Sequence, residues 1–331
     1  MSTIRYAAVA GLFYPDDPGV LRRQLGGFLA DVDGQEPAPK AQPVHPCTAP
    51  LGDVQDARMP RRPGWPGAAS IRSPKAQPVH PCTAPLGDVQ DARMPRRPGW
   101  PGAASIRSPK ALIVPHAGYV YSGPVAASAY ARLRSARGRI RRVVLLGPSH
   151  RVGFRGLALS GADWFETPLG RIAVDHVAEA VLHGLPSVQV LPRAHAEEHS
   201  LEVHLPFLQQ VLDEFTLVPI VVGESTPAEV AEVLERLWGG DETLIVISSD
   251  LSHYHDYETA RARDAATSRS IEALRYEDID AGDACGRGPV SGLLHYARDH
   301  GLRVQTLDLR NSGDTAGARD RVVGYGAWAV G

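Results

Sequence analysis

Four short runs of consecutive apolar residues constrain the fold of this chain more than any other feature. They are rich in β-branched side chains and occupy residues 111–114, 143–146, 217–222 and 244–247. Strands that are buried on both faces have this pattern, because neither face needs polar side chains. Residues 322–330 form one further run of the same kind. The runs therefore predict a central sheet that is covered on both sides.

Segments with helical spacing of their apolar residues alternate with these strands. The first of them, residues 20–31, follows Asp17 and Pro18, a pair that is typical of a helix N-cap and first turn. The others are residues 124–135, 176–184, 200–213, 227–238 and 260–275. This alternation predicts an α/β fold, with a mostly parallel or mixed central sheet flanked by helices on both faces.

A tandem duplication interrupts this pattern, since residues 40–74 recur letter for letter as residues 75–109. The segment is rich in Pro, Gly and Arg, so it cannot bury enough apolar surface to offset its ordering entropy. We therefore expect a single α/β domain made of residues 1–39 and 110–331, with a disordered insert at 40–109 that consists of two copies of one 35-residue segment. The insert also repeats a His/Cys pair that could offer zinc ligands, although its spacing matches no zinc-finger pattern: His45 with Cys47, and His80 with Cys82.

The bulk composition argues against several classes of partner. A net charge of -2 and an aromatic content of 6% predict binding neither to nucleic acid nor to acidic membranes. No apolar run is long enough to span a bilayer, and the N-terminus lacks the layout of a secretory signal. Three cysteines, an odd number, make a disulfide framework unexpected and favour a cytoplasmic location.

Histidines follow the carboxyl ends of three of the predicted strands. His116 comes after 111–114, His150 after 143–146, and Asp250 with His253 after 244–247. Open α/β sheets bind their ligands in the crevice beyond these strand ends. One such histidine is more often a solvated loop residue, but three at equivalent positions indicate a shared, imidazole-rich pocket.

A second cluster of polar residues spans 195–206. His195, Glu198 and His199 fit the inverted zinc pattern His-x-x-Glu-His, which requires both histidines on one continuous helix. Ser200 resembles an N-cap, which would start the helix after the pair and leave His195 on a loop. We therefore expect this cluster to lie beside the site.

Cys285 is the only cysteine outside the insert, and it lies in a Gly-rich turn before a predicted helix at 290–298. The helix N-terminus and Arg287 are both expected to favour its thiolate form. The alternative is a buried cysteine that acts as a small hydrophobic residue.

Together these strings resemble the Memo family, whose bacterial and archaeal members are described as the B component of the AmmeMemoRadiSam system. Six strings in order carry the resemblance: AGLFYP at 10–15, PHAGY at 115–119 with YSG at 121–123, LGPSH at 146–150, EHSLEVHLP at 198–206, SSD at 248–250 with His253, and CGR at 285–287.

The resemblance implies a fold similar to that of the class III extradiol dioxygenases, which hold iron with two histidines and a carboxylate. The metal positions of Memo proteins fall here on His116, His150 and Cys285, with the cysteine in place of the carboxylate. Asp250, His253 and His199 are then the candidate catalytic residues around the metal. The resemblance also implies iron or copper as the cofactor, and the other AmmeMemoRadiSam components, including a radical SAM protein, as partners.

The working hypothesis is a mononuclear metal site with a redox or dioxygenase-type activity on a small substrate. Two imidazoles and a thiolate suit copper(I) or iron(II), and His253, oriented by Asp250, would act as the general base. One alternative is a non-catalytic protein that binds a peptide or metabolite in the same crevice. The other is metal-independent hydrolysis with Cys285 as the nucleophile and a nearby histidine as the base.

Overall fold

The structure is a computed structural model, and it describes residues 2–33 and 109–331. These residues fall into one unit defined by their mutual contacts. Apart from Pro109, the duplicated insert lies outside the described residues, and its predicted disorder therefore stays a prediction. The two candidate zinc pairs, at residues 45 and 47 and at residues 80 and 82, lie outside them as well.

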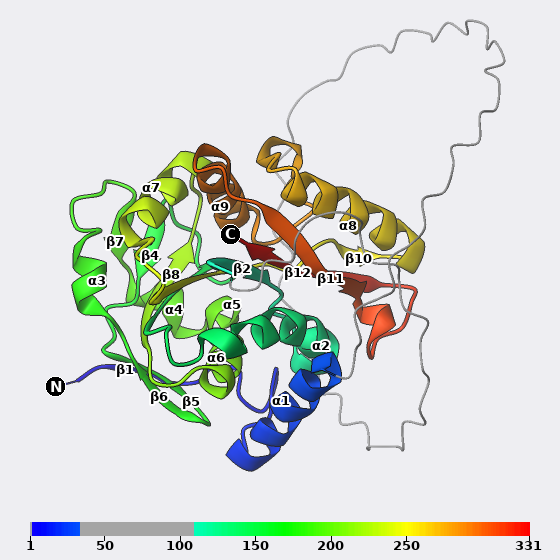
Figure 1. Cartoon of the computed structure of the whole chain (residues 1–331), viewed down its shortest axis with the longest axis horizontal. Helices are drawn as coiled ribbons and strands as arrows, with labels where there is room; N and C mark the ends of the chain where they lie inside the picture. Colours follow the sequence, from blue (N-terminus) through cyan, green and yellow to red (C-terminus); the bar gives the residue numbers. More distant parts are fainter. Residues whose placement is uncertain (1, 34–108) are drawn as a thin grey trace, which may run out of the picture. The chain divides into compact units, whose positions relative to one another are not determined.

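Within the described residues, nine strands form one mixed sheet (Figure 1). In spatial order eight of them are β10 (His253–His255), β12 (Val322–Val330), β2 (Ala111–Val114), β9 (Thr243–Ser248), β3 (Arg142–Pro148), β8 (Thr216–Val222), β4 (Leu157–Leu159) and β7 (Val188–Val190). β11 (Val304–Asn311) also pairs with β12. The four runs predicted as buried strands are β2, β9, β3 and β8, and they lie side by side and parallel. The expected mostly parallel or mixed sheet is confirmed.

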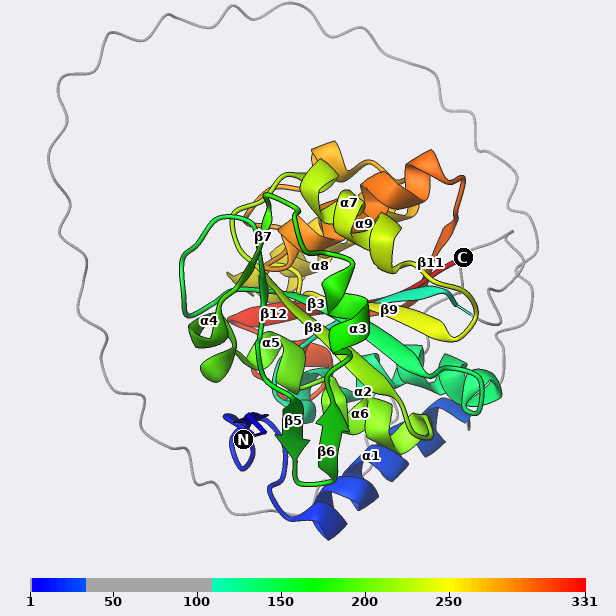
Figure 2. The ribbon, with the colours of Figure 1, turned by 90° about the vertical axis from the view of Figure 1, so that its left-hand side faces the viewer.

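Helices cover both faces of this sheet (Figure 2). Leu112 and Val114 of β2 pack in the core that includes α1 (Pro18–Asp33), α2 (Tyr119–Tyr130) and α6 (Leu205–Val211). Ile113, which points to the opposite face, packs in the core that includes α3 (His176–Ala180), α7 (Pro227–Leu237) and α9 (Arg287–Asp299). Successive side chains of a strand point to opposite faces, so an all-apolar strand needs two such cores.

The remaining elements lie around this centre. α8 (Tyr257–Glu272) packs on β11 and β12, and a small three-stranded sheet contains β1 (Ile4–Arg5), β5 (Trp164–Thr167) and β6 (Gly170–Ala173). Short helices complete the described residues: α4 (Pro192–Ala196), α5 (His199–Glu202), η1 (Ala131–Ala136), η2 (Tyr276–Asp278) and η3 (Ser312–Asp314).

The helix signals in the sequence were right at one position and wrong at another. Asp17 caps α1 as expected, because its carboxylate accepts a hydrogen bond of 2.7 Å from the backbone of Val20. The helix predicted at 200–213 is instead divided into α5 and α6. Pro206 lies in the first turn of α6, where a backbone N–H would have no partner within the helix. Inside a longer helix the same proline would remove a backbone hydrogen bond, so a new helix begins here.

No helix in the described part of the chain combines the length and the apolar character needed to cross a bilayer.

Candidate metal centre

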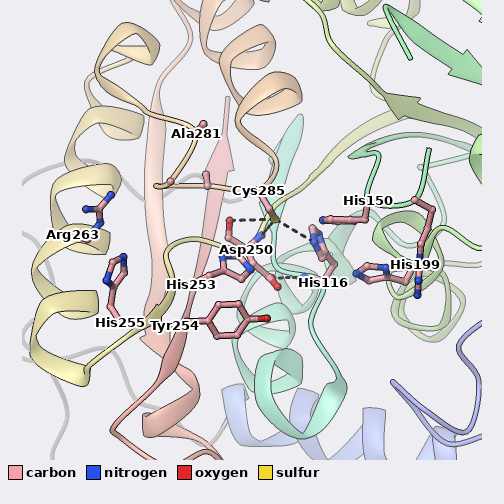
Figure 3. Close-up of a pocket in the computed structure, with 13 residues that line it drawn as sticks. His116, His150, His199, Asp250, His253, Tyr254, His255, Arg263, Ala281 and Cys285 are labelled. Atoms are coloured by element: carbon pink, nitrogen blue, oxygen red, sulfur yellow. Dashed lines mark hydrogen bonds between the residues drawn. The ribbon is translucent and has the colours of Figure 1, made fainter. Parts of the chain in front are cut away.

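Three side chains from distant parts of the sequence converge beyond the carboxyl ends of the parallel strands (Figure 3). His116 follows β2, His150 follows β3, and Cys285 precedes α9. One potential ligand atom from each lies within 4.8 Å of the other two. Cys285 Sγ is 3.3 Å from His116 Nε2. These are the three residues that the sequence analysis assigned to a metal, and the fold brings them together.

The hydrogen bonds of His116 determine which of its nitrogens carries the proton. Ser248 Oγ donates its single hydrogen to the carbonyl of Ser200 at 2.6 Å. The hydroxyl must therefore accept at its contact of 2.5 Å with His116 Nδ1, so Nδ1 is the protonated nitrogen. Burial, followed by repulsion from the neighbouring histidines, holds the pKa of His116 well below its usual value. A neutral ring with a bare Nε2 faces Cys285.

His150 is oriented in the same way by a carboxylate. Glu198 Oε1 lies 2.8 Å from His150 Nδ1, and Oε2 accepts from the backbone N–H of His150 at 2.6 Å. Although burial opposes ionisation, the hydrogen bonds from His150 and Ser200 lower the pKa of Glu198 to about 2. A carboxylate can only accept, so His150 donates from Nδ1 and presents Nε2 to the pocket. A carboxylate behind a ligating imidazole is a frequent feature of metal sites.

Cys285 is held against the end of β9 by backbone contacts. The backbone N–H of Asp250 donates to Cys285 Sγ at 3.3 Å, and the N–H of Gly286 donates to Ser249 Oγ at 3.0 Å. A Cβ on Gly286 would lie 2.3 Å from the carbonyl oxygen of Ser248, so only glycine allows this approach.

The expected ionisation of Cys285 is wrong for the protein without a metal. Burial, followed by the charge of Asp250, raises the pKa of the thiol far above its usual value. Arg287 is exposed and does not offset this desolvation. A metal ion would reverse the effect, because coordination deprotonates a thiol outright.

Asp250 has a role different from the expected one. Its Oδ1 accepts from the backbone N–H of His116 at 2.8 Å, and no hydrogen bond joins its carboxylate to His253. Asp250 therefore orients the loop after β2 and does not orient the imidazole of His253. Burial raises the pKa of Asp250 to about 7, and burial lowers the pKa of His253.

His199 lies beside the centre. Its ring stacks on that of His150 with a centroid distance of 4.6 Å and meets His116 edge-on at 5.5 Å. Burial lowers its pKa to about 4. His199, His150 and Glu198 form a second group whose potential ligand atoms lie within 4.8 Å of one another. However, Glu198 already accepts hydrogen bonds on both oxygens, which makes this the weaker donor set.

The inverted zinc pattern at 195–199 is not formed. α4 ends at Ala196 and α5 begins at His199, so the two histidines are not on one continuous helix. His195 Nε2 instead contacts the carbonyl of Ala158 at 2.8 Å. The expected N-cap is also wrong, because Glu198 caps α5, while Ser200 Oγ donates to the carbonyl of Pro148.

The converging side chains line one cavity of about 820 Å³. His116, Asp250 and Cys285 belong to its lining, together with the following residues: His150, Arg151, His199, His253, Tyr254, His255, Arg263, Ala281, Gly282 and Ala284. The three expected strand-end histidines therefore share one pocket.

The model of the family described as "Memo-like protein" matches residues 92–329. The chain belongs to the Memo family. A MEMO1 family protein of Saccharolobus solfataricus is 38% identical over 231 residues, which cover 64% of this chain and 80% of that protein. One of Metallosphaera sedula is 37% identical over 229 residues, with the same coverage of both chains. An uncharacterized protein of Escherichia coli K12 matches with a TM-score of 0.42 and 14% identity, covering 66% of this chain and 98% of that one.

Membership of the Memo family confirms the resemblance and agrees with an extradiol dioxygenase-like fold. Two contributions to this Memo site were missed in the sequence. Ser248 and Glu198 both lie in the strings that carry the resemblance, but nothing in those strings states which histidine each one contacts. Ser248 and His116 are 132 residues apart in the sequence, so their contact becomes visible only in the folded structure.

Proposed function

We propose that this Memo-family protein binds one iron or copper ion through His116 Nε2, His150 Nε2 and Cys285 Sγ. The observation that carries the proposal is the pair of imidazoles whose Nδ1 atoms are both engaged, by Ser248 and by Glu198. Each ring is left with Nε2 as its free ligand atom. Two neutral imidazoles and one thiolate form a soft donor set, which favours copper(I) or iron(II) over magnesium or calcium.

The chemistry that we propose is a metal-dependent oxidation of a small substrate in the cavity of about 820 Å³. A bound iron or copper ion would supply electron transfer and the activation of dioxygen. His253 lies in the same cavity, and its lowered pKa keeps the imidazole neutral at neutral pH. Its ring can therefore accept a proton from a substrate hydroxyl group.

The alternative of hydrolysis by a free Cys285 nucleophile has less support. The raised pKa of the thiol leaves almost no thiolate at neutral pH, and the thiolate is the reactive form. His116 Nε2 lies 3.3 Å from the sulfur and could act as the base in such a mechanism, but the orientation of His150 by Glu198 would then have no function.

Anaerobic titration with iron(II) and with copper(I) tests the metal assignment. The reference protein is a Cys47→Ser/Cys82→Ser variant, in which Cys285 is the only thiol. We expect one equivalent of metal per chain and a thiolate-to-metal absorption band after oxidation. Adding Cys285→Ser should abolish the band and weaken binding. Equal metal affinity with and without Cys285 would remove the sulfur from the proposed ligand set.

A further inference from the structure

Strand β10 has an irregularity in the wall of the metal cavity. His253 pairs with Val323 of β12 and His255 pairs with Val322, so Tyr254 is the extra residue of a β-bulge. All three residues of β10 belong to the cavity lining (Figure 3). In a regular strand the middle side chain would point to the opposite face. The bulge therefore allows three successive residues to line one cavity.

The backbone of Tyr254 is strained in this bulge. Its φ is 62°, in the left-handed region that glycine adopts freely and that tyrosine rarely adopts. Leu274 is the only other non-glycine residue with a positive φ among the described residues. A glycine at position 254 would form the same bulge without strain. The presence of a tyrosine side chain there needs a separate explanation.

Packing within the protein does not supply that explanation. Tyr254 is 64% exposed, so its ring buries little apolar surface. Arg321 lies over the ring, 5.1 Å from its centroid, and the ring of His253 meets it edge-on at 5.7 Å. These two contacts orient the ring but leave most of it open. An oriented, exposed ring in the lining of a cavity is suited to contact a ligand.

The other lining residues indicate the shape of that ligand. Six of the thirteen carry a planar ring: His116, His150, His199, His253, Tyr254 and His255. The proposed metal ligands account for only two of these rings. Planar rings pack on one another in offset stacks or edge to face, so a lining of this kind favours a flat ligand.

We propose that the cavity binds a flat aromatic or conjugated molecule and that Tyr254 is the residue on which its ring stacks. The inference rests on the proposed function in one respect, since this flat ligand would be the small substrate that is oxidised at the metal. The stacking contact itself requires no metal.

The test uses the full chain without metal and two neutral probes, benzamide and cyclohexanecarboxamide. They carry the same amide group, but only benzamide has a flat ring. NMR titration measures both dissociation constants, because it is sensitive to weak binding. Burial of apolar surface alone would not favour benzamide, since the cyclohexyl ring is at least as apolar. We expect benzamide to bind more tightly.

Variants of Tyr254 identify the side chain that makes this distinction. Tyr254→Ala should weaken the binding of benzamide about two- to tenfold and should change that of cyclohexanecarboxamide by less than about twofold. Tyr254→Phe keeps the flat ring and should bind benzamide like the wild type. Tyr6→Ala is the matched control, because Tyr6 is 62% exposed and is not in the cavity lining. It should leave both affinities unchanged.

Urea unfolding of a further variant tests the strain. Tyr254→Gly should unfold at a higher urea concentration than Tyr254→Ala, because both lack the ring but only glycine adopts a positive φ without strain. Equal midpoints would remove the reason for assigning a function to the tyrosine and would overturn the inference.

Two other results would also overturn it: equal affinity of the wild type for the two probes, or equal losses of benzamide binding in Tyr254→Ala and Tyr6→Ala. Weaker benzamide binding in Tyr254→Ala alone supports the stacking site. Absence of metal binding in the wild type contradicts the proposed function alone, because the probe titrations contain no metal.

Discussion

Glu198 contacts both the backbone and the side chain of His150, with distances of 2.6 Å to the backbone nitrogen and 2.8 Å to Nδ1. The same carboxylate caps α5 by accepting from the N–H of Ser200. One buried side chain therefore fixes both the start of a helix and the orientation of a proposed metal ligand. Gly147 permits this arrangement, because a Cβ there would lie 2.7 Å from Ser200 Oγ and would push α5 away from β3.

We predict that Glu198→Gln weakens metal binding by about 10–100-fold, the usual cost of losing a carboxylate behind a ligating histidine. The amide keeps one accepting oxygen, but its NH2 group is a donor and cannot accept from the second N–H of His150. Anaerobic titration with copper(I) or iron(II) measures the change. Glu197→Gln is the control, since Glu197 is exposed and adjacent in sequence. Unchanged affinity in Glu198→Gln would mean that His150 is not a ligand.

The turn before α9 gives a second prediction. Gly286→Ala should destabilise the metal-free protein by about 1–3 kcal/mol and displace Cys285, because the new Cβ would lie 2.3 Å from the carbonyl oxygen of Ser248. Gly288→Ala, two residues later in the first turn of α9, is the matched control. Its Cβ would lie 3.5 Å from Val222 Cγ1, an ordinary contact. Urea unfolding of both variants checks the prediction, and equal stability of the two would contradict it.

Most of the central sheet could be predicted from the sequence. The runs at 111–114 and 322–330 match the bounds of β2 and β12, because burial on both faces leaves an unbroken apolar pattern. β11 was missed because all of its residues except Asn311 are only partly buried, and alternation between polar and apolar side chains is weak there. β10 was missed because its three residues, two of them histidines, are too few to show the apolar pattern of a strand.

The candidate site was predictable in its members but not in its contacts. A histidine after a buried strand is visible in the sequence, and this placed His116 and His150 at the same edge of the sheet. The hydrogen-bond partners of those rings, Ser248 and Glu198, are distant in the sequence and are brought to them only by the fold. Asp250 illustrates this, since its position three residues before His253 suggested a pair, yet its carboxylate accepts from the backbone of His116.

A pH-dependent prediction concerns Asp264, away from the proposed metal ligands. Its Oδ1 accepts from the backbone of Ser252, and its Oδ2 is buried with no hydrogen-bond partner among the residues that the structure describes. Burial raises the pKa of Asp264 from 3.8 to about 6. The folded state thus favours the neutral carboxyl. The stabilisation by the neutral form is fully present below about pH 4 and is lost as the pH rises through about 6.

The free energy of unfolding should therefore fall by at most about 3 kcal/mol over this interval because of Asp264. Asp264→Asn lacks this titration. We expect the stability of the variant relative to the wild type to be higher at about pH 7.5 than at about pH 4.5, as measured by urea unfolding at both pH values. A stability difference that is the same at both pH values would show that Asp264 ionises normally in the fold.

The last prediction concerns the buried ion pair of Arg5 and Glu202. Glu202 is completely buried, pairs with Arg5, and accepts from the hydroxyl of Tyr14 at 2.6 Å. Arg5 also donates to the carbonyl of Glu198 at 2.6 Å, so the pair ties β1 to the segment that orients His150.

Removing one member of a buried pair leaves the other charge without compensation. Glu202→Gln should therefore lower the free energy of unfolding by about 3–5 kcal/mol. The exposed pair of Arg137 and Asp213 provides the control, and Asp213→Asn should cost about 1 kcal/mol or less. Denaturant unfolding of the metal-free protein compares the two. Similar small losses in both variants would show that the pair of Arg5 and Glu202 does not stabilise the fold. A buried guanidinium without a counter-charge should lower the free energy of unfolding by much more.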